Sequence, residues 1–81
     1  MNAKLEAKLK NLPRTPGVYF HKSKSGEVIY VGKAAVLKNR VRQYFQGRRD
    51  MDVKTLALVA EIEDTDWIET ESEIDALFLE S

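Results

Sequence analysis

The chain has 81 residues, and its 13 basic and 13 acidic side chains give a formal net charge of zero. This length allows one small domain, or a piece of one, that buries roughly 60% of its unfolded surface. The absence of cysteine excludes a disulfide framework and a thiolate metal site, and it fits a reducing cytoplasm. No apolar run in the sequence is long enough to span a membrane.

The charges are segregated along the chain. From Lys33 to Arg49 six side chains are basic and none is acidic, whereas from Glu61 to the last residue nine are acidic and none is basic. One part of the surface can therefore attract a polyanion although the whole chain is neutral. Two solvated helical faces of opposite sign that stabilise each other are the alternative, and the charges alone do not decide between the two.

The first expected element is a short amphipathic helix. Its leucines repeat at helical spacing from Leu5 to Leu12, with lysines between them, and Pro13 stops it near Asn11. Residues 13–16 are expected to form an extended connector, because each of the two prolines biases its predecessor away from helix.

A β-hairpin is expected over residues 17–31. Its strands carry Gly17-Val18-Tyr19 and Tyr30-Val31-Gly32, and the polar run Ser23-Lys24-Ser25-Gly26 between them is a turn signal. A four-residue loop over that run would pair the two strands so that Tyr19 stands opposite Tyr30.

This register predicts that both tyrosines share one face of the sheet, because directly opposed residues of an antiparallel pair point the same way. A slip of one residue would send Tyr19 and Tyr30 to opposite faces. An aromatic cross-strand pair also stabilises ordinary sheets, so the pair alone does not establish a function. The other face is expected to be core, formed by Val18, Phe20, Ile29 and Val31.

Two helices follow. The first covers about residues 36–46, and Gly47 stands where a C-terminal glycine cap would be. The second covers about residues 52–62, and either Asp50 or Asp52 can cap its start. The apolar stripe of the first of these helices consists of Val36, Leu37, Val41 and Phe45.

The chain is expected to end with a strand and a helix. Asp66–Thr70 reads as a third strand, and Thr70 with Glu73 forms a capping box that opens a last helix of about residues 71–81. No linker divides the sequence, so residues 1–81 are expected to form a single domain.

Arg40 and Tyr44 are the first candidates for chemistry. They are four residues apart in the expected helix 36–46, so their side chains lie on one face, one turn apart. The helix begins just after the strand of Tyr30, so Arg40 can reach the tyrosine face. A guanidinium can hold a phosphate with two hydrogen bonds. An exposed arginine beside a half-buried tyrosine is the alternative.

Lys33 and His21 lie close to the tyrosines in sequence. Lys33 follows Gly32, whose lack of a Cβ lets a backbone approach a ligand closely, so this lysine can hold a phosphate or stabilise a neighbouring phenolate. A solvated loop lysine is the alternative. His21 has no second metal ligand near it, so we expect a surface residue or one that supports the site from behind, with proton transfer as a minor alternative.

Glu80 is placed where a carboxylate is disfavoured. It follows an apolar run at the C-terminus of the expected last helix, where desolvation and the helix dipole both act against its charge. A bound cation or an arginine would offset that cost, and Mg²⁺ commonly uses only one or two carboxylates together with water. Exposure of Glu80 at the chain end is the alternative.

These residue types suit metal-assisted hydrolysis of a phosphodiester. That reaction needs a base for the attacking water, a cation for the leaving oxygen and positive donors for the developing charge. Tyrosine is a weak base at neutral pH because its pKa is normally near 10. It can serve only if Lys33, the metal or a hydrogen bond stabilises the phenolate.

The paired motifs resemble those of the GIY-YIG nuclease family, with Gly17-Val18-Tyr19 as the first half and Tyr30-Val31-Gly32 as the second. The chain is more narrowly similar to the N-terminal domain of the bacterial UvrC family, from about Leu12 to the last residue. Both halves at this spacing, together with the arginine–tyrosine helix and the terminal glutamate, make a specific signal. The stretches with this narrower similarity are residues 28–34, 37–41, 44–45 and 75–80.

The resemblance implies an α+β fold in which a small three-stranded antiparallel sheet is flanked by helices. It implies that Tyr19 is the candidate general base, assisted by Tyr30 and Lys33. It also implies that Arg40 binds and polarises the scissile phosphate and that Tyr44 helps to position it.

The same resemblance implies a metal and partners. Glu80 would be the single carboxylate ligand of one divalent cation, Mg²⁺ or Mn²⁺. The substrate would be damaged double-stranded DNA delivered by UvrB, cut on the 3′ side of the lesion in the bacterial cytoplasm. The candidate DNA-binding residues are Lys33, Lys38, Arg40, Arg42, Arg48 and Arg49.

Family domains continue past the glutamate with another basic segment, so we expect this chain to be a monomeric N-terminal fragment of a longer protein. The short basic segment predicts weak, salt-sensitive DNA binding. Two other hypotheses remain: another nuclease of the GIY-YIG family, of the homing or structure-specific type, and a non-catalytic module for nucleic-acid binding or protein docking that kept the fold.

Overall fold

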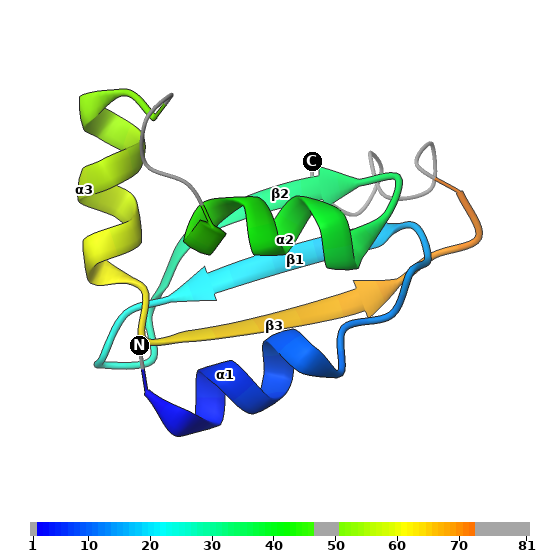
Figure 1. The fold of residues 1–81 in the computed structure, drawn as a ribbon, viewed down its shortest axis with the longest axis horizontal. Helices are drawn as coiled ribbons and strands as arrows, with labels where there is room; N and C mark the ends of the chain where they lie inside the picture. The colour runs from blue at the N-terminus through cyan, green and yellow to red at the C-terminus, as the bar shows by residue number, and fades with distance from the viewer. Residues whose placement is uncertain (1, 47–50, 73–81) are drawn as a thin grey trace.

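The structure is a computed structural model that describes residues 2–46 and 51–72 (Figure 1). No helix within these ranges has the length and apolarity needed to cross a membrane. Residues 73–81 of the expected last helix, the Gly47 cap and the alternative cap Asp50 lie outside the described residues, whereas residues 71 and 72 are described and form a bend. The described elements, in chain order, are α1 (Ala3–Lys10), β1 (Gly17–Lys22), β2 (Val28–Ala34), α2 (Leu37–Gln46), α3 (Val53–Glu61) and β3 (Asp64–Glu69).

The three strands form one sheet in the order β2-β1-β3, and both pairings are antiparallel. This confirms the expected three-stranded antiparallel sheet flanked by helices. The third strand begins at Asp64, two residues earlier than predicted, and runs the full length of β1, from Lys22 opposite Asp64 to Gly17 opposite Glu69. The central position of β1 places any side chain on it between neighbours from two other strands.

The predicted hairpin register is wrong by two residues, because Tyr19 stands opposite Gly32 and His21 stands opposite Tyr30. One residue of the difference comes from the turn, where Lys22 faces Val28 rather than Glu27. The other comes from an irregularity in the ladder next to His21, which leaves one extra residue on β2. Each one-residue slip exchanges the faces, and two slips restore them.

The described core lies on the tyrosine face. Tyr19 is buried there, in one cluster with Leu12, which precedes the 13–16 connector, and residues of α2. On the face that was expected to be the core, Val18 is fully buried. The other three residues predicted for that face, which are only partly buried, are Phe20, Ile29 and Val31.

Local hydrogen bonds fix where the helices begin. The side chain of Asn2 accepts a hydrogen bond from the Leu5 amide at the start of α1. Asp52 caps α3 in the same way, which confirms one of the two predicted caps. The start of α2 is capped by the chain itself, because two of its first amides donate to carbonyls of the 13–16 connector. The connector therefore aligns α2 with β1.

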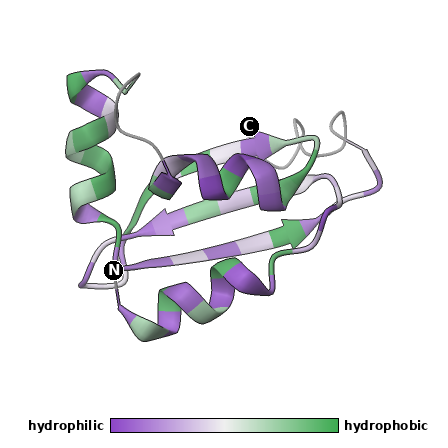
Figure 2. Ribbon diagram, in the orientation of Figure 1, coloured by the Kyte–Doolittle hydropathy of each residue, from purple (hydrophilic) through white to green (hydrophobic). Residues whose placement is uncertain are grey.

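Helix α3 stands beyond the end of the sheet, and it is more apolar than α1 or α2 (Figures 1 and 2). None of its residues is fully buried, and Val53 is the most exposed large apolar side chain described. The short helix leads directly into β3, so its position determines how that strand enters the sheet.

Candidate active site

All three tyrosines of the chain meet on one face of the sheet. Tyr19 comes from β1, Tyr30 from β2 and Tyr44 from α2. Their ring centroids are 6.2 Å apart for Tyr19 and Tyr30, 5.8 Å for Tyr19 and Tyr44, and 6.2 Å for Tyr30 and Tyr44. The predicted sharing of a face by Tyr19 and Tyr30 is confirmed, although as diagonal neighbours and not as a directly opposed pair.

The hydroxyls of Tyr19 and Tyr44 form a 2.8 Å hydrogen bond, in which either oxygen can donate. Gly32 makes room for this contact: it faces Tyr19 across the strands, and a Cβ at that position would overlap Cζ and Oη of the tyrosine. Tyr19 is only 2% exposed whereas Tyr30 is 41% exposed, so Tyr30 presents the more accessible phenol.

Tyr44 is the phenol that keeps its proton. Burial, reinforced by the hydrogen bond to Tyr19, raises the pKa of Tyr44 far above its usual range. When Tyr19 acts as a base, Tyr44 can therefore donate its hydrogen to the Tyr19 oxygen. This is the stabilising hydrogen bond that a tyrosine base requires.

His21 lies at the centre of the same face, which contradicts the surface alternative of its prediction and leaves the alternative that it supports the site from behind. The side chain is fully buried, and its Nδ1 lies 2.9 Å from Oγ1 of Thr65 on β3. Its ring also lies 4.6 Å from that of Tyr44. Burial lowers the pKa of His21 to about 4, so the ring is neutral at neutral pH. The alternation of strand side chains, two positions on from Tyr19, is the sequence signal that locates it.

Arg40 lies one turn before Tyr44 on α2, as predicted, and its side chain is exposed. Both residues line a depression of about 330 Å³ between α2 and the start of α3. Asp52 also lines it, but its carboxylate accepts the capping hydrogen bond of α3, which lowers the pKa of Asp52. The depression thus combines a solvent-facing guanidinium with the edge of the tyrosine cluster.

Lys33 lies on β2, three residues after Tyr30. It stands opposite Val18 in the sheet, so its side chain starts on the face away from Tyr19. Because β2 is an edge strand, the lysine reaches the tyrosine face only around that edge.

The expected metal ligand Glu80 and the basic residues Arg48 and Arg49 lie outside the described residues. Within residues 2–46 and 51–72, no three His, Cys, Asp or Glu side chains come together in a way that could hold a metal ion. The described part of the site therefore supplies phenols and cations.

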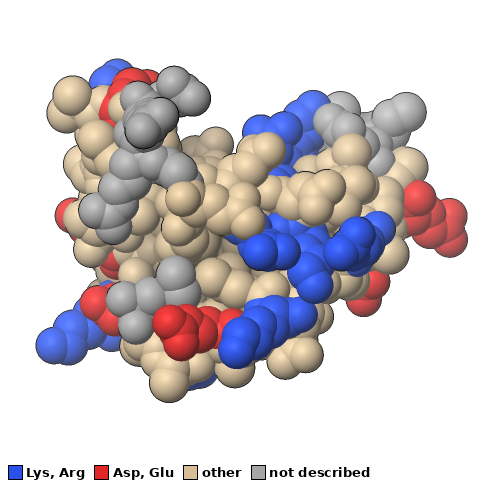
Figure 3. All heavy atoms as spheres, viewed as in Figure 1, with Lys and Arg blue, Asp and Glu red and all other residues tan. Residues whose placement is uncertain are grey.

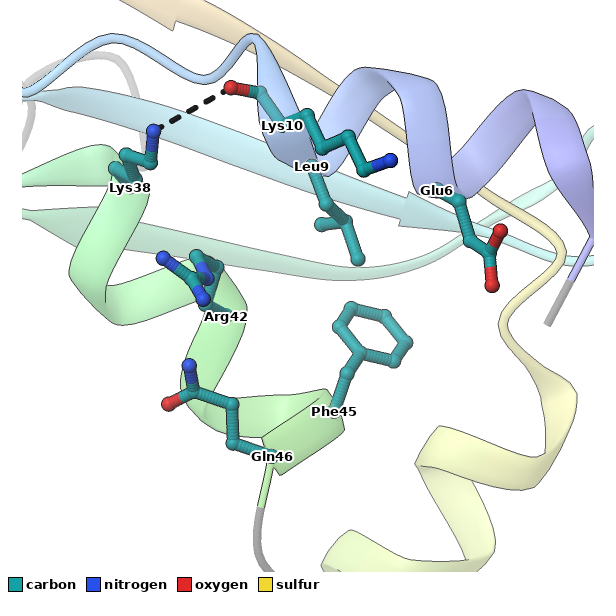
Figure 4. A pocket seen from close by; sticks show the side chains of 7 residues that line it. All are labelled: Glu6, Leu9, Lys10, Lys38, Arg42, Phe45 and Gln46. Atoms are coloured by element: carbon teal, nitrogen blue, oxygen red, sulfur yellow. Dashed lines mark hydrogen bonds between the residues drawn. The ribbon is translucent and has the colours of Figure 1, made fainter.

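Lys38 and Arg42 occupy the side of α2 that faces α1. With Lys10 they border a groove of about 450 Å³, across which Leu9 and Phe45 point toward each other (Figure 4). The Lys38 ammonium donates a 3.3 Å hydrogen bond to the Lys10 carbonyl. In the space-filling view, basic side chains gather over α2 and the adjoining edge of α1 (Figure 3). Lys38 and Arg42, two of the basic residues predicted to attract a polyanion, thus lie on one basic surface with Lys10.

Comparison with known proteins agrees with this architecture. Residues 15–81 match the family model described as the UvrC-like GIY-YIG domain. The UvrABC system protein C of Streptococcus sanguinis is 56% identical over 80 residues, which cover 99% of this chain and 13% of that protein. The chain thus spans about an eighth of the length of this relative.

Solved structures match over nearly the whole chain. The N-terminal endonuclease domain of UvrC from Thermotoga maritima, bound to magnesium as its catalytic divalent cation, superposes with a TM-score of 0.81 at 35% identity, covering 99% of this chain and 85% of that one. A point mutant of that domain with a tyrosine replaced by phenylalanine, also bound to the cation, gives a TM-score of 0.82 at 34% identity, covering 99% and 84%.

The fold and its tyrosine cluster are therefore those of a GIY-YIG domain. More narrowly, the chain belongs to the family of UvrC-like GIY-YIG domains.

Proposed function

We propose that this chain is a DNA endonuclease domain of nucleotide excision repair. It hydrolyses one phosphodiester on the 3′ side of a lesion, in damaged duplex DNA delivered by UvrB in the bacterial cytoplasm. The observation that carries this proposal is the Tyr19–Tyr44 hydrogen bond, with Arg40 one helical turn away on the same helix.

The residues divide the chemistry between them. Tyr19 takes the proton of the attacking water, and Tyr44 supports its ionised form through the 2.8 Å hydrogen bond. Arg40 holds the scissile phosphate with its planar fork and offsets the negative charge that develops there. Tyr30 assists from the exposed side of the cluster, and Lys33 assists from around the edge of β2.

The accessibility of the phenols favours a second candidate for the base. Because Tyr30 is far more exposed than Tyr19, a water molecule can reach its oxygen without any movement of α2. Tyr19 remains the proposed base because its hydroxyl lies 2.8 Å from that of Tyr44, whose hydrogen can stabilise the phenolate. Separate phenylalanine substitutions at the two positions distinguish these roles.

A single divalent cation, Mg²⁺ or Mn²⁺, fits the donor set if Glu80 supplies its carboxylate. Mg²⁺ commonly takes one or two carboxylates and fills its remaining positions with water. Asp52, the acidic side chain that lines the Arg40 depression, already caps α3. When bound, the cation would stabilise charge on the leaving oxygen.

The basic groove between α1 and α2 is proposed to contact the DNA backbone away from the scissile phosphate. Lys38 and Arg42 face this groove, whereas Arg40 and Tyr44 line the depression on the α3 side. Lys33, Arg48 and Arg49 complete the proposed set of DNA contacts. Such contacts to phosphates position a protein on a duplex without reading its sequence.

The test is nicking of a lesion-bearing duplex loaded with UvrB, in the presence of Mg²⁺, by the full-length protein. The wild type is compared with Tyr19→Phe, Tyr30→Phe and Arg40→Ala, and Arg14→Ala is the control for loss of an exposed arginine. The proposal is supported if Tyr19→Phe and Arg40→Ala lose the 3′-side cut while Tyr30→Phe and Arg14→Ala still make it. A wild type that binds DNA or UvrB but makes no 3′-side cut would instead identify a docking module.

A further inference from the structure

Among the described residues of the tyrosine face, His21 is the buried titratable side chain that the proposed reaction leaves unused. It occupies the middle of a row across the sheet, with Tyr30 opposite on β2 and Thr65 opposite on β3. Tyr44 of α2 packs over this row. Every strand and helix that contributes a tyrosine to the site therefore also contacts this histidine.

The hydrogen bonding of the imidazole is one-sided. Nδ1 is 2.9 Å from Oγ1 of Thr65, whereas Nε2 is buried and has no hydrogen-bond partner among the described residues. A buried polar atom without a partner is costly, and an apolar side chain of similar size would avoid that cost. The histidine is thus a poor choice for packing alone.

The ring is placed to control Tyr44. The rings of His21 and Tyr44 are 4.6 Å apart with an interplanar angle of 76°, which is an edge-to-face contact. This orientation restricts the tilt of the phenol, and the tilt decides whether the Tyr44 hydroxyl meets Tyr19 at 2.8 Å. The Thr65 hydroxyl in turn prevents rotation of the imidazole about its own axis.

We propose that His21 and Thr65 are a positioning pair: Thr65 fixes the imidazole, the imidazole fixes Tyr44, and Tyr44 holds the hydrogen bond to Tyr19. This role rests on the proposed function, in which Tyr19 is the base. The ring acts through its shape and hydrogen bonding because burial keeps it neutral at neutral pH, and the titratable groups described around it are the three tyrosines.

The kinetic test uses the full-length protein with a UvrB-loaded lesion duplex and Mg²⁺. His21→Met keeps an uncharged side chain of comparable bulk, Thr65→Val removes only the hydroxyl, and Thr65→Ser keeps it. We expect kcat to fall about 10- to 100-fold in His21→Met and Thr65→Val with KM unchanged, because the reacting groups move while substrate contacts remain. Thr65→Ser should retain most of the wild-type kcat.

The double variant adds a second criterion. If the two residues act as one unit, His21→Met combined with Thr65→Val should be no slower than His21→Met alone. A purely structural role predicts otherwise, because activity would then follow the folded fraction and kcat per folded molecule would not change. Unchanged kcat in folded His21→Met, or a Thr65→Ser variant as slow as Thr65→Val, would overturn the proposal.

An NMR experiment tests the positioning role of His21 separately from the proposed nuclease function. In the wild type, the hydrogen-bonded hydroxyl proton shared by Tyr19 and Tyr44 should exchange slowly with solvent and be visible by NMR. His21→Met should lose that signal, and its persistence would overturn the positioning role. A wild type that shows the signal but does not cut DNA would refute the proposed function, while the NMR comparison would still decide the role of His21.

Discussion

Substitution of Gly32 by alanine should disturb both stability and catalysis, because this glycine leaves the space that the Tyr19 phenol fills. Its backbone has no positive φ, so an alanine is not excluded by conformation. The added Cβ would, however, overlap Cζ and Oη of Tyr19. The tyrosine ring must therefore move, and its hydrogen bond to Tyr44 must lengthen or break.

The expected change in the free energy of unfolding follows from two destabilising effects and one stabilising effect. Overpacking of this kind costs about 1–3 kcal/mol, and a lost hydrogen bond costs about 1 kcal/mol more. Reduced freedom of the unfolded chain returns about 0.4–1 kcal/mol. We expect the free energy of unfolding to fall by about 1–3 kcal/mol. Cleavage by the full-length protein should fall about 100-fold, since a displacement near 1 Å is enough for such a loss.

Urea denaturation of Gly32→Ala, followed by fluorescence of Trp67, measures the first effect. Trp67 is the only tryptophan, and it stands opposite Tyr19 on β3. Gly26→Ala is the matched control: its glycine has a φ of 87° and open space around it, so it should cost stability without affecting cleavage. In a Tyr19→Leu background the clash is absent. An equal cost of Gly32→Ala in both backgrounds would refute the steric argument.

Three further predictions concern charge. The pKa of His21 is about 4 in the folded chain and 6.5 for a free side chain, so the unfolded state binds more protons at His21 between these pH values. The free energy of unfolding should therefore fall by up to about 3 kcal/mol as the pH is lowered from 6.5 to 4. Urea denaturation of His21→Met at the same pH values should lack this pH dependence. Lys38→Ala with Arg42→Ala should reduce the slope of log K against log salt by about 1–2 in DNA-binding titrations, whereas Lys24→Ala should leave it unchanged. Lys8→Met, which removes ion pairs of 2.9 and 2.6 Å to two aspartates of β3, should cost about 1 kcal/mol in urea denaturation, and less in high salt.

The helices and strands were predictable because local chemistry specifies them. The leucine spacing and Pro13 define α1, Asp52 caps α3, and the turn signal ending at Gly26 separates β1 from β2. The hairpin register was not predictable to the residue. It depends on a loop one residue longer than expected and on the extra residue next to His21, and neither leaves a mark in the hydrophobic pattern.

The candidate site was predictable where it depends on spacing and was missed where it depends on long-range packing. Arg40 and Tyr44 share a helix face by periodicity alone, and the tyrosine motifs identify their strands. The burial of His21 requires α2 to pack above it and Thr65 to approach from 44 residues away, so the sequence could not decide between a surface position and a supporting one. The face of Lys33 was predictable, because strand alternation from Tyr30 places it on the opposite face in the predicted register and in the observed one.

The ion pairs of the neutral chain are unevenly distributed over its surface. Asp64 and Asp66 of β3 form ion pairs with lysines of α1 and β1, so the charges of these two aspartates are neutralised within the fold. Lys38 and Arg42 have no ion pair among residues 2–46 and 51–72. They lie about 120–160° around α2 from Arg40 and Tyr44, since successive residues of a helix are turned by about 100°. One ten-residue helix therefore presents the proposed phosphate-binding arginine to one side and two further cations to the other, as the proposed function requires.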